Sequence, residues 1–219
     1  MIKNLLYHLI IFFNLLFPLI GASIDISLGD AFSISQDLKV HREGFDDIDF
    51  NASFKTNGLK SPQYYSIRVR QEVAENFFEF EFIHHKLYIH DDLPDEIEKF
   101  EITDGFNLLL INVQKVINQS LGYRIGLGTV VTHPDIIIDG QTNYVEGGGL
   151  IPKFWTDGYH WGGISSQFSI FLNKKINDKL HYSIEGKAVL AKASIPIVGG
   201  NFDLPNISFH ILLGISFLV

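Results

Sequence analysis

Alternation of apolar and polar residues with a period of two is the feature that most constrains this chain of 219 residues. At the C-terminus the two alternating sets are His210, Leu212, Gly214 and Ser216, and Phe209, Ile211, Leu213, Ile215 and Phe217. Successive side chains of a β-strand point to opposite faces, so this pattern predicts a strand with one apolar and one more polar face. The pattern recurs in residues 64–71, 77–89, 123–133, 165–172 and 181–190. No sustained helical stripe follows residue 23, so we predict an all-β fold.

The spacing of these segments predicts how the strands connect. Adding residues 47–54 and 100–116 gives eight strands, and residues 24–35 could supply or extend the first strand, so ten strands are the alternative. Short joins at residues 71–76, 118–122 and 173–178 alternate with long joins at 55–63, 90–99, 134–160 and 195–206. We therefore expect the short and the long connections at opposite ends of an antiparallel sheet.

Two kinds of closed sheet fit this pattern, and they differ in which face meets water. A soluble ligand-binding barrel turns its apolar faces inward, whereas a membrane barrel turns them toward lipid and has tight turns at one end and long loops at the other. The predicted strands of about 10 residues are long enough to cross a bilayer. Aromatic residues near the strand ends also suggest two interfacial girdles, with Tyr65, Tyr88, Phe100 and Trp161 beside the long loops. We favour a closed antiparallel transmembrane β-barrel with a polar, filled interior.

The N-terminus has the pattern of a secretory signal. Lys3 precedes an apolar run from Leu5 to Ile20, and the small residues Gly21 to Ser23 follow it. We interpret residues 1–23 as a signal peptide and residues 24–219 as one barrel domain, with a single membrane anchor as the alternative reading of the run. Export, a membrane barrel and a diderm envelope go together, so the expected location is the outer membrane of a diderm bacterium.

Composition excludes several classes of function. The chain has 17 Lys and Arg against 25 Asp and Glu, a net charge of −8, which gives no electrostatic reason to bind nucleic acid. It has no cysteine, which excludes disulfides and thiolate chemistry. No residue spacing predicts a metal site or a cofactor.

The sequence resembles the small outer-membrane β-barrels, a group that includes outer-membrane protein A, the palmitoyltransferase barrel and the lipid A deacylases. The resemblance lies in the alternation of nearly the whole mature chain, and most specifically in the C-terminal strand Ser208–Val219. It implies a monomer that contacts outer-membrane lipid and lipopolysaccharide and is inserted by the barrel-assembly machinery. The last residue of such strands is usually Phe, whereas this chain ends with Val219.

Polar residues on the inward faces form the first candidate site. Arg68 and Arg70 are joined to Glu79 and Glu81 through a short hairpin, so the four should face one lumen on adjacent strands. Buried charges must be paired, and we expect a network that plugs the barrel. Its predicted members are Arg68, Arg70, Glu79, Glu81, Arg124, Gln167, Glu185, Lys187 and His210.

A second candidate site is catalytic. His160, Ser165, Ser166 and Glu185 could form a base, a nucleophile and an orienting carboxylate near the outer rim. The deacylase resemblance implies a His and a Ser two residues apart, whereas the spacing of five from His160 to Ser165 predicts opposite faces. Two functions therefore compete: a non-enzymatic envelope protein with a plugged interior, and a lipid A-modifying acyl hydrolase or acyltransferase.

Overall fold

Eight antiparallel strands form a closed ring in the computed structural model, which describes residues 22–73, 76–89, 93–102, 104–142 and 158–218. The ring strands, in order, are β1 (Ser23–Ser33), β4 (Tyr65–Val73), β5 (Asn76–His84), β8 (Phe106–Val116), β9 (Leu121–Thr132), β12 (His160–Asn177), β13 (Leu180–Ile197) and β14 (Gly200–Leu218). Pairing of β1 with β14, from Ser23 opposite Leu218 to Ser33 opposite Ser208, closes the ring. Closure leaves the ring no free edge. The predicted all-β, eight-stranded barrel is confirmed.

The first strand of the ring is not the one that we predicted. Residues 48–52 form a strand, β3 (Ile48–Ala52), but it lies outside the ring, and β1 takes the predicted place. After β1 the chain continues along β14 as β2 (Gln36–Arg42), and the amide of Ile34 donates to the carbonyl of Ile207 between them. The alternation is similar in both segments. Long-range pairing with the 19 residues of β14 decides which of them closes the barrel.

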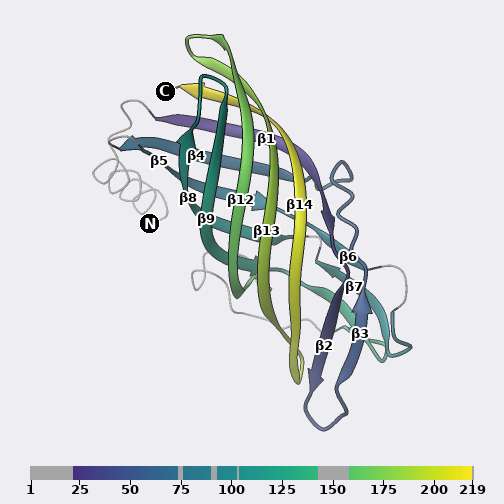
Figure 1. Cartoon of the computed structure of the whole chain (residues 1–219). Coiled ribbons are helices and arrows are strands. Elements are labelled where there is room, and N and C mark those ends of the chain that lie inside the picture. The colour runs from purple at the N-terminus through teal and green to yellow at the C-terminus, as the bar shows by residue number, and fades with distance from the viewer. Residues whose placement is uncertain (1–21, 74–75, 90–92, 103, 143–157, 219) are drawn as a thin grey trace, which may run out of the picture.

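The connections divide between the two ends as predicted, with one exception. The long join expected at residues 195–206 is a two-residue turn, 198–199, because β13 and β14 continue as paired strands beyond the membrane-spanning part. Residues 74–75, 117–120 and 178–179 join β4 to β5, β8 to β9 and β12 to β13 at the end where Ser23 and Leu218 pair. The longer connections lie at the opposite end, in the lower half of Figure 1. Within the described residues no helix is long and apolar enough to span a membrane.

The described parts of the long connections are themselves folded. A four-stranded sheet has the order β11 (Gln141–Thr142), β10 (Asp135–Ile138), β7 (Ile97–Ile102) and β6 (Leu87–Ile89). On the other side, β2 and β3 extend the sheet beside β14. With 18 and 19 residues, β13 and β14 are longer than the roughly 9–11 residues that a bilayer requires. Their outer parts therefore belong to a layer beyond the membrane, which we call the cap (residues 36–63, 87–89, 93–102, 133–142 and 192–204).

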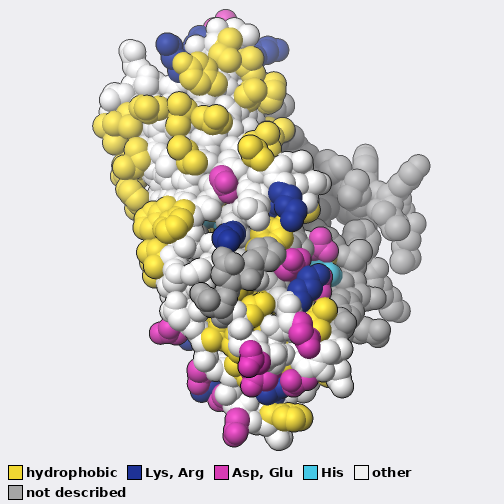
Figure 2. Space-filling model, turned by 90° about the vertical axis from the view of Figure 1, so that its right-hand side faces the viewer, with side chains coloured by type: hydrophobic (Ala, Val, Ile, Leu, Met, Phe, Trp, Pro, Cys, Tyr) yellow, Lys and Arg dark blue, Asp and Glu magenta, His cyan; other side chains and the backbone are white. Residues whose placement is uncertain are grey.

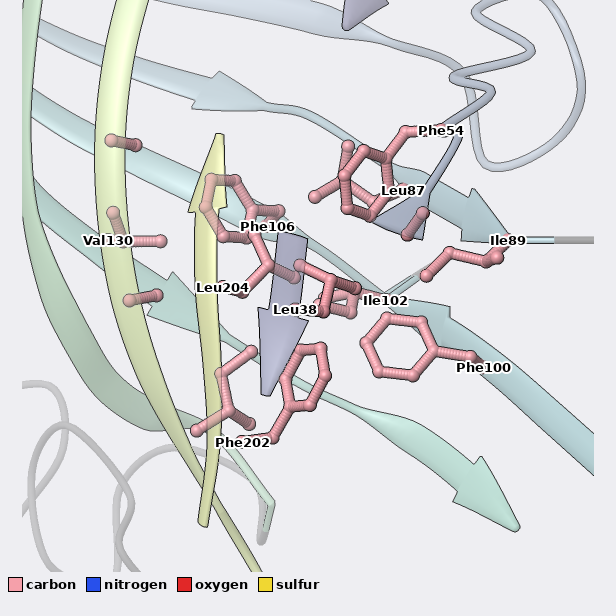
Figure 3. Packing of buried hydrophobic residues seen from close by; sticks show 14 of the residues in the cluster. Leu38, Phe54, Leu87, Ile89, Phe100, Ile102, Phe106, Val130, Phe202 and Leu204 are labelled. Carbon is pink, nitrogen blue, oxygen red and sulfur yellow. The ribbon is translucent and has the colours of Figure 1, made fainter. Parts of the chain in front are cut away.

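An apolar core holds the cap together. Figure 3 shows Leu38 of β2 and Phe202 of β14 facing Phe100 and Ile102 of β7, and the Phe100 and Phe202 rings lie 4.5 Å apart. All four side chains are buried. Tyr88 is buried as well, so Tyr88 and Phe100 do not form the interfacial girdle that we predicted for them. Alternation of residues cannot distinguish an aromatic side chain that faces lipid from one that faces a second sheet.

Candidate functional site

The outer wall of the barrel is apolar and its inner side is polar. In β14, Phe209, Ile211 and Leu213 are 50%, 62% and 63% exposed, whereas Ser208 and His210 are buried. Figure 2 shows hydrophobic side chains gathered over the part of the molecule with the short turns, and Asp and Glu side chains gathered toward the other end. Such a large apolar surface is stable only against hydrocarbon, and this inside-out pattern is that of a membrane barrel. The fold is a transmembrane β-barrel.

Glu81 occupies the centre of the interior. Its Oε1 accepts hydrogen bonds from Ser66 Oγ at 2.8 Å, Arg68 Nη2 at 2.6 Å and Lys187 Nζ at 2.6 Å. Its Oε2 accepts hydrogen bonds from two amide side chains, at 2.8 Å from Asn112 Nδ2 and at 2.7 Å from Gln167 Nε2. The residue is fully buried. Five donors around one carboxylate are the compensation that a buried charge requires.

Two further carboxylates bind the arginines around Glu81. Arg124 donates through Nε to both oxygens of Glu79, at 3.0 and 2.8 Å, and through Nη1 to Glu185 Oε2 at 3.1 Å. Glu185 Oε2 also accepts from Arg68 Nη2 at 3.0 Å. Arg70 lies opposite Glu79 in the register of β4 and β5, and donates to Gln114 Oε1 at 3.3 Å. Arginine, whose guanidinium donates in several directions, suits a site where one cation serves two carboxylates.

The structure thus brings together the predicted residues from Arg68 to Lys187, and it adds three that we did not predict. Asp25 Oδ2 lies 3.5 Å from Arg68 Nη1, while Asn112 and Gln114 supply amide groups. With Asp25 the network holds four carboxylates and four cations, all 9% exposed or less. The sequence signal for the three added residues was their inward position, Asp25 on β1 and Asn112 and Gln114 on β8. For the two residues on β8 this signal was obscured because the alternation of residues 108–111 is blurred.

His210 belongs to a separate polar group beside the network. Tyr64 Oη lies 2.6 Å from His210 Nδ1, and Ser208 Oγ lies 2.8 Å from Nε2. The ring of His85 lies 5.0 Å from that of His210. This group separates the ionic part of the interior from the apolar core of the cap, since Tyr64 belongs to that core as well.

A β-bulge changes the expected facing of the candidate catalytic residues. The register between β12 and β9 shifts between Trp161 and Gly163, so one extra residue is inserted. His160 and Ser165 consequently both face inward and are buried, whereas the spacing of five predicted opposite faces. Ser166 is half-buried on the other face of β12.

The structure does not bring the candidate catalytic set together. Glu185 pairs with Phe171, six residues along β12 from Ser165, which is about 20 Å at the rise of a β-strand. Its Oε2 already accepts from Arg68 and Arg124. His160 and Ser165 are themselves separated by about 15 Å along the strand. A catalytic triad needs hydrogen-bond distances between its members.

Comparisons with known proteins give structural likenesses only. No protein-family model and no curated protein sequence matches the chain. Among solved structures, Neisserial surface protein A has a TM-score of 0.46 and 9% identity, covering 91% of this chain and 97% of that one. Ail, the attachment invasion locus protein of Yersinia pestis, gives 0.45 and 12%, covering 90% and 98%. The outer membrane protein OprG from Pseudomonas aeruginosa gives 0.47 and 10%, covering 91% and 97%. By its own closed ring of eight antiparallel strands and its apolar outer wall, the chain has the fold of the small outer-membrane β-barrels.

Proposed function

We propose that the protein is a monomeric, non-enzymatic outer-membrane barrel that displays a folded cap on the outer face of the membrane. The observation that carries this proposal is the combination of an interior filled by charged side chains with a mouth covered by the apolar core of the cap. The interior of an eight-stranded barrel is just wide enough to be filled by its own side chains, as the buried charged residues fill it here. The protein therefore acts through its surfaces and not as a channel.

The orientation follows from the two ends. Short turns face the periplasm in outer-membrane barrels, and long connections face outward. The end with the short turns is also where Ser23 of β1 pairs with Leu218 of β14. In this orientation the cap lies outside the cell beside lipopolysaccharide. The predicted signal peptide, residues 1–23, lies almost entirely outside the described residues.

The cap presents a surface with acidic residues held in defined positions. In the β2–β3 hairpin, Asp47 Oδ2 lies 2.9 Å from Lys39 Nζ, and Asp47 Oδ1 lies 2.6 Å from His41 Nδ1. The hydrogen bond from Lys39, and then that from His41, lowers the pKa of the Asp47 carboxyl below its ordinary value of 3.8. Loops on a rigid scaffold are where binding surfaces are usually found, so this side of the molecule is suited to display.

Ion conductance tests the proposal directly. The purified chain, folded into planar bilayers, should give no large and stable currents, while its heat-dependent shift on a denaturing gel should show that the barrel is folded. Stable nonspecific currents from the folded protein would refute the plugged interior.

The lipid-modifying alternative predicts a different result. Expression in a diderm host would change the acylation of lipid A, and His160→Ala or Ser165→Ala would abolish that change. The proposal made here predicts an unchanged lipid A mass spectrum in all three cases.

A further inference from the structure

A groove of about 200 Å³ opens on the outer wall of the barrel, where the ring meets the cap. Its lining comes from β4, β5, β8 and β9 and from the residues before β8 and β12: Tyr65, Phe82, His84, Asp104, Asn107, Leu109, Val131 and Tyr159. Phe82 and Leu109 pair across β5 and β8, and the exposed Phe80 and Ile111 follow them in the same register on the lipid-facing wall. The apolar part of the groove is therefore continuous with the surface that contacts hydrocarbon.

The polar part of the groove has a fixed hydrogen-bond direction. Asn107 Nδ2 donates to the carbonyl oxygen of Asp104 at 3.4 Å, which orients the amide so that its Oδ1 faces His84. His84 Nδ1 lies 2.9 Å from that oxygen and must be the donor. In a neutral imidazole with the proton on Nδ1, the other nitrogen, Nε2, can only accept a hydrogen bond.

His84 Nε2 lacks the donor that it requires. It is buried, and it has no hydrogen-bond partner among the described residues. The side chain is 7% exposed, and its ring stacks on Tyr65 with the ring centroids 5.2 Å apart, so the imidazole is held in place. A buried acceptor without a partner is destabilising, and a ligand that donates a hydrogen bond to it removes that cost.

Charge at the groove limits the class of ligand. Its eight lining residues include no Lys or Arg, and they include the carboxylate of Asp104, whose side chain is 61% exposed. Asp104 Oδ2 lies 3.7 Å from His133 Nδ1, outside the lining. A phosphate or carboxylate headgroup in the groove would meet this carboxylate without a Lys or Arg among the lining residues to compensate it. A hydroxyl group, in contrast, can donate to an imidazole nitrogen or to a carboxylate.

We propose that this groove binds an outer-leaflet lipid with an uncharged, hydroxyl-bearing headgroup. One acyl chain lies along Phe82, Leu109 and Val131, and a headgroup hydroxyl donates a hydrogen bond to His84 Nε2. The inference rests on the proposed function, because it requires the outer wall to lie in a bilayer with this rim at the outer leaflet.

The imidazole nitrogens of His84 provide a direct readout. The full chain, labelled with ¹⁵N-histidine, is folded into phosphatidylcholine nanodiscs that contain graded fractions of one added lipid. The added lipids are monogalactosyl diacylglycerol, the same lipid with its sugar hydroxyls methylated, and phosphatidylglycerol, which carries hydroxyls and a phosphate. Leu109→Trp fills the groove, and Ile125→Trp is the matched control on the lipid-facing wall outside it. Insertion is verified separately by flotation and by heat-dependent gel mobility.

Only the uncharged galactolipid should give a saturable shift of the His84 Nε2 resonance, with His41 and His181 unchanged. Leu109→Trp should weaken the saturation about ten-fold or more, a loss of about 1.4 kcal/mol, and Ile125→Trp should leave it unchanged. A shift that does not saturate, or that is equal with the methylated lipid or with phosphatidylglycerol, would overturn the proposal. If the chain fails to insert at all, the proposed function fails first and the lipid site fails with it.

Discussion

Neutralising Glu81 tests how much the interior network contributes to the barrel. The carboxylate accepts five hydrogen bonds, two of them from the cations Arg68 and Lys187. Replacing it with glutamine preserves the shape of the side chain, but the amide NH2 group takes the place of one carboxylate oxygen. That NH2 group then faces other hydrogen-bond donors, whichever way the amide is oriented. It also leaves the cations with one unmatched charge, because the network holds four carboxylates and four cations.

The expected loss is large because nothing in the interior can replace the missing charge. Removing one partner of a buried ion pair costs about 3–5 kcal/mol, mainly because the other partner remains buried and unpaired. For an m-value of about 2 kcal/mol/M, this loss moves the midpoint of urea unfolding down by about 1.5–2.5 M. Lys187→Met restores the charge balance, so the double variant Glu81→Gln with Lys187→Met should recover part of the loss.

Equilibrium unfolding in urea, followed by tryptophan fluorescence in phospholipid vesicles, measures both variants. Glu72→Gln is the matched control, since Glu72 is exposed at the rim with the short turns. It should change stability by no more than about 0.5 kcal/mol. If Glu81→Gln costs less than about 1 kcal/mol, or if the double variant is no more stable than the single one, the network is not held together by charge pairing.

Three further predictions concern a glycine, the cap core and pH. A methyl group at Gly126 would lie 1.9 Å from Asn112 Oδ1, so Gly126→Ala should destabilise the barrel by about 1–3 kcal/mol. Gly186 has open space around it, so Gly186→Ala should not destabilise the barrel, and urea unfolding compares the two variants. Phe202→Ala removes a fully buried ring from the cap and should cost about 3–5 kcal/mol. Amide exchange and proteolysis in the cap should become faster, while the heat-dependent gel mobility of the barrel persists. Phe45 is 68% exposed, so Phe45→Ala should change neither the exchange nor the proteolysis of the cap. The contacts of Asp47 lower its pKa in the folded state, so they stabilise the β2–β3 hairpin fully above the ordinary pKa of 3.8. This stabilisation is lost as the pH falls through the lower folded-state pKa. Amide exchange measured against pH should show the loss, and the exchange of Asp47→Asn should lack this pH dependence.

The facing of each strand could be predicted from the sequence, because it depends only on local geometry. A strand turns successive side chains to opposite sides wherever it lies, so the alternation alone sets Phe80 on the opposite face from Glu81, and Ile211 on the opposite face from His210. The same reasoning placed the two arginines and the two glutamates on the inward faces of adjacent strands, and the register of the structure sets Arg68 opposite Glu81 and Arg70 opposite Glu79. The division into short and long connections followed from the lengths of the segments, except at residues 195–206, where β13 and β14 form paired strands around a two-residue turn.

Long-range pairing decided the rest. Closure by β1 instead of β3, and the contact of Lys187 with Glu81 across the ring, join residues far apart in the chain. The bulge beside Gly162 reversed the expected facing of His160 relative to Ser165, because inserting one residue shifts every later side chain by one position. The cap core of Phe100 and Phe202 arises only when two sheets meet. Alternation fixes which side of a strand is apolar, but only the assembled structure determines whether that side meets lipid or another sheet.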